Sequence, residues 1–144
     1  MIKNGITDRT YALLILNTKD AEIHIGRLGV LNIVCGFYVY VGSAKRNLVP
    51  RIRRHLSNNK KNFWHIDYLL SSKTVKTREI WASPGEQECQ MAQCFFKRGY
   101  PYVEKFGSSD CRCWSHLFFL NKKPGIIKNL LKKNGFRNIY VCPN

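Results

Sequence analysis

The chain has 144 residues, which is long enough for one domain with one hydrophobic core. Hydrophobic residues make up 44% of it and aromatic residues 12%, which excludes a disordered chain, and no apolar run approaches the roughly 20 residues that span a bilayer. With 24 Lys and Arg against 9 Asp and Glu, the formal net charge is +15, which favours a polyanionic partner, nucleic acid above all.

The pattern of apolar residues predicts short strands and helices along the chain. Compact apolar runs, or runs that alternate polar with apolar residues, predict strands, whereas apolar residues that recur every three or four positions predict helices. We therefore expect, in chain order, a buried strand at 10–16, a hairpin around 22–31, a strand at 36–41, helices at 48–56 and 63–70, and a strand at 76–82.

The next predicted helix has sequence signals at both ends. Ser83 and Glu86 have the spacing of a capping box, Pro84 suits a first turn, and Gly99 is a natural stop. A strand at 115–120, an amphipathic helix at 126–133 and a last strand at 138–142 follow. Together these elements predict a single α/β domain, with a small mixed, partly antiparallel sheet sandwiched by helices.

The polar N-terminal residues lack the apolar core of a signal peptide, so we expect a cytoplasmic protein. On the same ground we expect the six cysteines to be reduced thiols rather than a disulfide framework.

One predicted strand, the glycine turn after it and the next helix carry groups suited to phosphodiester cleavage. Tyr38 and Tyr40 share one face of the strand, because side chains alternate with a period of two. Arg51 and His55 are four residues apart, so they share one face of the helix. Such cleavage needs a base for water, a cation for the oxyanion and commonly a metal ion. The alternative interpretation is that Tyr40 is a core aromatic and the arginines form a solvated helix face.

This stretch resembles the GIY-YIG nuclease superfamily, in which the second motif ends a strand and leads into a helix with an essential Arg. Tyr40-Val41-Gly42 matches that motif, Arg51 matches the helix Arg, and His55 matches a Tyr or His that often follows one turn later. The resemblance implies a GIY-YIG-like fold and catalytic roles for Tyr40, Arg51 and His55. It also implies one divalent ion, Mg²⁺ or Mn²⁺, held by a Glu on a later helix.

Glu88 is our match for that metal ligand. It shares a helix face with Ala92 and Phe95, which must be buried, so its carboxylate is expected to point towards the sheet and to need a partner there. The alternative is that Glu88 only stabilises the helix N-terminus through the dipole.

The first motif of the superfamily, Gly-Ile-Tyr, is matched to Arg9-Thr10-Tyr11, which makes Tyr11 the catalytic phenol. Arg9 stands in place of the glycine, and the predicted hairpin accounts for the long interval between Tyr11 and Tyr40. Gly36-Phe37-Tyr38 is the other candidate. It lies on the same strand as Tyr40, so Tyr11 is preferred.

Over nearly its full length, the chain is similar to a branch of small prokaryotic domains in this superfamily, some of them fused to the DNA-repair enzyme endonuclease III. The shared blocks are 40–44, 54–56, 64–69, 88–89, 106–111 and 115–117. In the superfamily an Asn after the metal-site helix helps to hold the phosphate. No residue here matches that Asn, and Ser109, Asp110 and Asn121 are the candidates to replace it.

Two further groups of residues are candidates for chemistry. His65 and Asp67 lie close together on a predicted helix and could orient a water or a nucleotide, or could bond locally. Cys111, Cys113 and His116 are soft metal ligands close together, and a zinc site there needs a fourth ligand from Cys89, Cys94 or His65. The alternative is a group of small buried thiols with a hydrogen-bonded His.

Basic and polar residues flank the predicted site and are expected to contact phosphates, with a steep salt dependence. They are Ser43, Lys45, Arg46, Arg54, Lys60 and Lys61.

Three functions are compatible with these features. The first is a divalent-metal-dependent DNA endonuclease, acting in DNA repair, with RNA not excluded as a substrate. The second is a nucleic-acid-binding module that has the nuclease fold without catalysis. The third is a thiol enzyme with Cys111 as its nucleophile.

Overall fold

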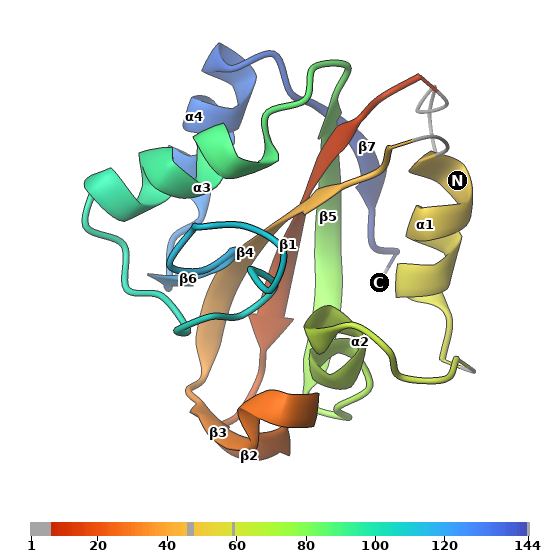
Figure 1. The fold of residues 1–144 in the computed structure, drawn as a ribbon, viewed down its shortest axis with the longest axis vertical. Coiled ribbons are helices and arrows are strands. Elements are labelled where there is room, and N and C mark those ends of the chain that lie inside the picture. The colour runs from red at the N-terminus through yellow and green to blue at the C-terminus, as the bar shows by residue number, and fades with distance from the viewer. Residues whose placement is uncertain (1–6, 46–47, 59, 144) are drawn as a thin grey trace.

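A five-stranded sheet forms the centre of the molecule in the computed structural model, which describes residues 7–45, 48–58 and 60–143 (Figure 1). The strands lie in the order β6-β4-β1-β5-β7, and a separate two-stranded sheet pairs β2 with β3. The strands are β1 (Thr10–Asn17), β2 (Ala21–His24), β3 (Val30–Ile33), β4 (Gly36–Ser43), β5 (Val75–Ser83), β6 (Leu117–Asn121) and β7 (Arg137–Val141). The helices are α1 (Leu48–Leu56), α2 (His65–Leu70), α3 (Glu88–Lys97) and α4 (Gly125–Lys133), with a short 3-10 helix at Gly26–Leu28.

Helices cover both faces of the five-stranded sheet, because alternate residues of its strands are apolar on each side. Leu13 and Ile15 of β1 pack in one core with α1, α2 and the β2–β3 hairpin. Ala12 and Leu14 of the same strand pack in a second core with α3 and α4. The predicted fold class, an α/β sheet sandwiched by helices, is therefore confirmed.

The pairings within the described sheet are antiparallel throughout, more so than the partly antiparallel sheet that the sequence predicts. The β2–β3 hairpin lies between β1 and β4 along the chain but forms its own sheet. β1 and β4 therefore pair directly as neighbours, although a long connection joins them. In this register Tyr11 lies directly opposite Gly42, which brings the first predicted motif beside the second.

The predicted start of α3 is wrong. Ser83 is the last residue of β5, where it pairs with Thr10, and its hydroxyl bonds to the side chain of Gln87. Glu86 forms an exposed ion pair with Arg9 instead of a capping contact. The helix begins only at Glu88, because strand pairing with β1 holds Ser83 in extended backbone.

Among the described residues, the helices are all too short or too polar to cross a membrane.

Candidate active site

Most of the predicted site residues lie around one cleft of about 1070 Å³. The cleft is bounded by the ends of β1 and β4, by α1, by the start of α2 and the segment before it, by the start of α3, and by the loop before β6. The predicted residues that line it are Tyr11, Tyr40, Ser43, Lys45, Arg51, Arg54, His65, Glu88, Ser109 and Asp110. Chain topology thus assembles groups that are far apart in the sequence.

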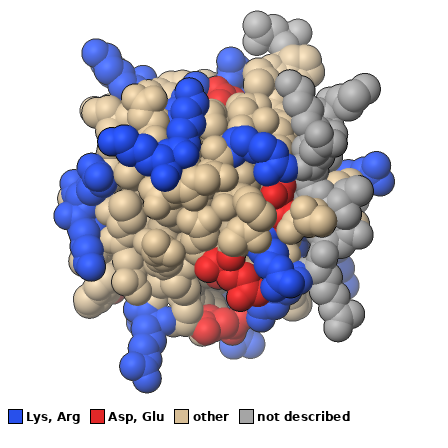
Figure 2. All heavy atoms as spheres, turned by 90° about the horizontal axis from the view of Figure 1, so that it is seen from above, with Lys and Arg blue, Asp and Glu red and all other residues tan. Residues whose placement is uncertain are grey.

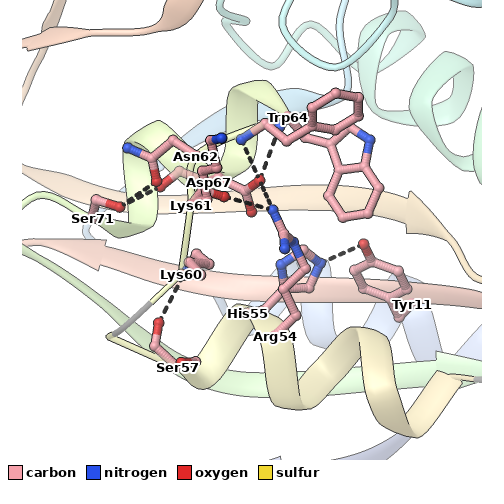
Figure 3. Close-up of polar contacts among 11 residues, drawn as sticks. Tyr11, Arg54, His55, Ser57, Lys60, Lys61, Asn62, Trp64, Asp67 and Ser71 are labelled. Carbon is pink, nitrogen blue, oxygen red and sulfur yellow. Dashed lines mark hydrogen bonds and ion pairs between the residues drawn. The ribbon is translucent and has the colours of Figure 1, made fainter.

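The hydroxyl of Tyr11 and Nε2 of His55 are hydrogen-bonded at 2.6 Å, and both side chains are buried (Figure 3). Burial lowers the pKa of His55 to about 3, so its ring is neutral at physiological pH. Burial also raises the pKa of Tyr11, although the nearby Arg51 opposes that shift. The phenol and the imidazole are therefore both neutral, and the tautomer of His55 decides which of the two donates in this hydrogen bond.

Gly42 makes room for the ring of Tyr11. A Cβ at position 42 would overlap Cζ and the hydroxyl of Tyr11, because the two residues are cross-strand partners and the ring lies over the glycine. The packing of the Tyr11 ring therefore explains why the third residue of the Tyr40-Val41-Gly42 motif is a glycine. Tyr38 lies elsewhere, since its hydroxyl bonds to the carbonyl of Val34 and its ring contacts Phe119.

Two arginines of α1 stack on Trp64. The guanidinium carbons of Arg51 and Arg54 lie 4.5 and 4.8 Å from the centre of the Trp64 ring system. Arg54 also donates to Asp67 at 2.7 Å and to the carbonyl of Lys61 at 2.9 Å (Figure 3). The Trp64 side chain was not among the predicted site residues, and its only sequence signal was its place in the shared block 64–69.

Asp67 has a structural role in this arrangement. Its carboxylate is fully buried and accepts hydrogen bonds from Arg54 and from the backbone N–H groups of Phe63 and Trp64. Burial alone raises its pKa, but these hydrogen bonds and the charge of Arg54 outweigh burial and hold the pKa below its usual value. Asp67 thus fixes Arg54 and the start of α2, and it does not line the cleft.

Glu88 points towards the sheet, as the helix face predicts, and its partner there is His116. Oε2 of Glu88 lies 3.4 Å from Nδ1 of His116, which also lies 3.0 Å from the carbonyl oxygen of Val41. The Glu88 side chain keeps 30% of its surface exposed and lines the cleft, whereas His116 is buried. Burial lowers the pKa of His116, but the hydrogen bond and charge of Glu88 outweigh it and raise the value to about 9.

The loop before β6 forms one wall of the cleft. The backbone N–H of Gly107 donates to Nδ1 of His65 at 2.9 Å, which joins this wall to α2. Gly107 has a φ of +71°, and a Cβ there would approach Tyr40 and His116. Ser109 and Asp110 are exposed on this wall, whereas Asn121 lies at the far end of β6, opposite Phe37, and does not line the cleft.

Only some of the residues predicted to contact phosphates line the cleft. Ser43, Lys45 and Arg54 line the cleft, and Arg46 lies outside the described residues. Lys60 bonds to the carbonyl of Ser57, and neither it nor Lys61 lines the cleft. Figure 2 shows Lys and Arg side chains spread around one whole face of the molecule, with few acidic side chains among them. Charge alone therefore does not single out one binding site on that face.

Four potential metal ligands lie close together beside Glu88. They are Cys89, Cys111, Cys113 and His116, and their ligand atoms all lie within 4.8 Å of one another. Such a group could hold a metal ion. The sequence supplied three of the four, and the structure selects Cys89 rather than Cys94 or His65 as the fourth. The spacing along the chain could not make that choice, because all three candidates for the fourth ligand lie on helices outside the loop that holds Cys111 and Cys113.

A sequence-family model described as "Domain of unknown function DUF123" matches residues 10–136. The matched stretch contains every described residue that lines the cleft and all four potential metal ligands. No curated protein and no solved structure matches the chain.

Proposed function

The chain belongs to the DUF123 family, and from the chemistry of its cleft we propose that it is a divalent-metal-dependent endonuclease that hydrolyses phosphodiester bonds in DNA. The observation that carries the proposal is the convergence of Tyr11, Tyr40, Arg51 and Glu88 on one cleft from four separate elements. A phenol, a guanidinium and a carboxylate are the groups that phosphoryl transfer to water uses for proton transfer, charge stabilisation and metal binding.

Nucleic acid suits this cleft better than a small phosphate ester does. Phe63 lines the cleft with 76% of its surface exposed, and its ring packs edge to face with Trp64. Exposed aromatic rings beside basic side chains bind stacked bases and the phosphate backbone together. Lys45 and Arg51 supply the positive charge at the same rim. The net charge of +15 favours the same class of partner.

Each side chain has a specific role in the proposed reaction. Arg51, half-buried and stacked on Trp64, neutralises the charge that develops on the phosphate oxygens. Tyr11 donates its proton to the leaving oxygen and regains a proton from the attacking water, and neutral His55 holds the phenol in place through the 2.6 Å hydrogen bond. Ser43 and Lys45 contact the flanking phosphates.

The carboxylate of Glu88 fits a hard divalent ion such as Mg²⁺ or Mn²⁺, because Oε1 has no hydrogen-bond partner among the described residues and the side chain lines the cleft. Magnesium is commonly held by one or two carboxylates, with water and substrate phosphates completing the shell. When bound, such an ion polarises the scissile phosphate.

The roles of Tyr11, Arg51 and Glu88 correspond to those that the resemblance to the GIY-YIG superfamily implies, so the proposal includes membership of that superfamily and a role in DNA repair. The position of Tyr11 in the cleft, with Tyr38 outside it, supports the match of the first motif to Tyr11.

The second candidate is a nucleic-acid-binding module without catalysis. The contact of Glu88 with His116 favours it, because a carboxylate engaged by a buried imidazole is a weaker ligand for a second cation. In addition, no Asn lines the described part of the cleft to hold the phosphate.

A nicking assay separates the two candidates. Supercoiled plasmid and a branched DNA substrate are incubated with the protein in Mg²⁺, in Mn²⁺ and with no added divalent ion. The endonuclease proposal expects cleavage that depends on the added ion and that Glu88→Ala abolishes. Salt-sensitive binding with no cleavage in either ion identifies the binding module instead.

A further inference from the structure

The four potential metal ligands come from two segments that are separated along the chain. Cys89 lies in the first turn of α3, whereas Cys111 and Cys113 lie in the loop before β6 and His116 immediately precedes that strand. All three cysteines are half-buried free thiols, and His116 is buried. Cysteines that only fill a core are usually fully buried. The ligand atoms of these thiols instead lie close to one another, and Cys89 and Cys111 also line the cleft.

We propose that Cys89, Cys111, Cys113 and His116 bind one Zn²⁺ ion in a closed, structural site, distinct from the divalent-ion site at Glu88. Three thiolates and one imidazole are a ligand set typical of structural zinc, and four protein ligands leave no open position for substrate or water. Soft sulfur ligands select against Mg²⁺ and Mn²⁺, which prefer oxygen.

The orientation of His116 supports this assignment. Nε2 lies 3.3 Å from Sγ of Cys111, close to the roughly 3.6 Å that separates a sulfur and a nitrogen ligand of tetrahedral zinc with usual bond lengths. Nδ1 is turned away, towards the carbonyl oxygen of Val41 at 3.0 Å and Oε2 of Glu88 at 3.4 Å. Histidine ligands of zinc typically donate their second N–H to a carboxylate or a carbonyl oxygen, and His116 has both nearby.

The loop that contributes most ligands lacks regular secondary structure, and it is held by scattered backbone hydrogen bonds and by the buried ring of Phe106. Residues 98–116, all of them described, contain no helix and no strand apart from a single bridge between Tyr102 and Phe118. An ordered loop of this length needs a local source of stability, because its closure and ordering cost conformational entropy. A zinc ion would join this loop to α3 and so fix the wall that carries Gly107, Ser109 and Asp110.

The zinc site and the proposed nuclease are linked through Glu88 but can be tested separately. Glu88 has one oxygen facing the zinc ligand His116 and lines the cleft with the rest of its carboxylate. Zinc binding would therefore set the orientation of the side chain proposed to hold the catalytic ion. The zinc content is measured without any nucleic acid, so either proposal can fail while the other holds.

The first measurement is the metal content of the purified, reduced protein by mass spectrometry, with excess Mg²⁺ present throughout. We expect about one zinc per chain in the wild type and in Cys94→Ser, whose cysteine is half-buried on the same helix α3 but outside the cluster. Cys111→Ser and Cys113→Ser are expected to lose most of the zinc. Full zinc occupancy in both of these variants overturns the assignment.

A second measurement does not depend on the variants folding. The wild type is loaded with Co²⁺ under reducing conditions, and its absorption spectrum is recorded. A tetrahedral site with three thiolates gives strong visible ligand-field bands together with sulfur-to-metal charge transfer, and zinc is expected to displace the cobalt stoichiometrically. A wild type that holds neither zinc nor cobalt, or one whose cluster cysteines form a disulfide on purification, contradicts the proposal.

Discussion

The hydroxyl of Tyr11 lies 2.6 Å from Nε2 of His55, and the ring of Tyr11 occupies the space that a side chain at position 42 would need. The strand β1, the helix α1 and the glycine of β4 therefore fix one phenol at the wall of the cleft. Since neither partner of the hydrogen bond is charged at neutral pH, a proton is available on the phenol in a buried setting. The following predictions depend on this arrangement.

Tyr11→Phe is expected to reduce DNA nicking by about 100-fold or more, because it removes a proton-transfer group. It should cost only about 1–3 kcal/mol of unfolding free energy, since one buried nitrogen loses its partner. Tyr38→Phe is the matched control, because it removes a tyrosine hydroxyl that is hydrogen-bonded outside the cleft, to the carbonyl of Val34. Equal nicking by the two variants would show that Tyr11 has no catalytic role.

Gly42→Ala is expected to displace the Tyr11 ring, break its bond to His55 and destabilise the protein by about 1–3 kcal/mol. Gly125→Ala is the control, since a Cβ at this helical position meets nothing within 4 Å and should be neutral or slightly stabilising. Urea unfolding monitored by circular dichroism gives both values. A Gly42→Ala variant as stable and active as the wild type would contradict the packing described here.

The pH dependence of stability should report His55. Its pKa rises from about 3 in the folded state to 6.5 in the unfolded chain, so the unfolded chain binds more protons between these values. Unfolding free energy should therefore fall as the pH decreases below 6.5, by about 2.5 kcal/mol between pH 7 and pH 4.5. The window lies above the range in which Asp67 titrates.

Urea denaturation curves of the wild type and of His55→Gln, compared at each pH, isolate that contribution because the other titrating groups are common to both proteins. The free-energy difference between the two should shrink as the pH falls. A difference that is constant across the window would mean that His55 is not held neutral by burial.

Lys45→Gln is expected to weaken DNA binding and to reduce the slope of log K against log salt concentration by about 0.7–0.9, as the loss of one phosphate contact does. Lys45 is exposed and lines the cleft. Lys133→Gln is the charge-matched control, because Lys133 is exposed on α4, which covers the other face of the sheet. Fluorescence anisotropy with a labelled duplex measures both slopes, and equal slopes would place the DNA elsewhere.

Local patterns predict the elements of this fold well, because most strands and helices have an apolar period that agrees with their packing. The turn of residues 83–87 is the exception. Ser83 and Glu86 have the spacing of a helix cap, but pairing of β5 with β1 extends the strand through Ser83 and delays the helix. A contact between strands that are distant in the sequence overrides the local signal there.

The candidate site likewise combines residues that a local sequence pattern identifies with contacts that only the packing of distant elements creates. Tyr40, Gly42 and Arg51 lie close enough in the sequence to be read as one unit, whereas the stacking of Arg51 and Arg54 on Trp64 depends on where α2 packs. Likewise, the choice of Cys89 as the fourth potential metal ligand depends on the loop before β6 crossing the start of α3. Such contacts between elements have no periodic sequence signal.

The central claim, that the cleft cuts DNA, is tested most directly by comparing Arg51→Ala with the wild type in two assays on one branched DNA substrate. Arg51 lines the cleft, and removing its charge should chiefly affect the transition state. We expect Mg²⁺-dependent nicking to fall by about 100-fold or more, while the dissociation constant for DNA changes by less than about 10-fold. Cleavage that Arg51→Ala leaves unchanged, or a wild type that binds this DNA and never cuts it, would contradict the account.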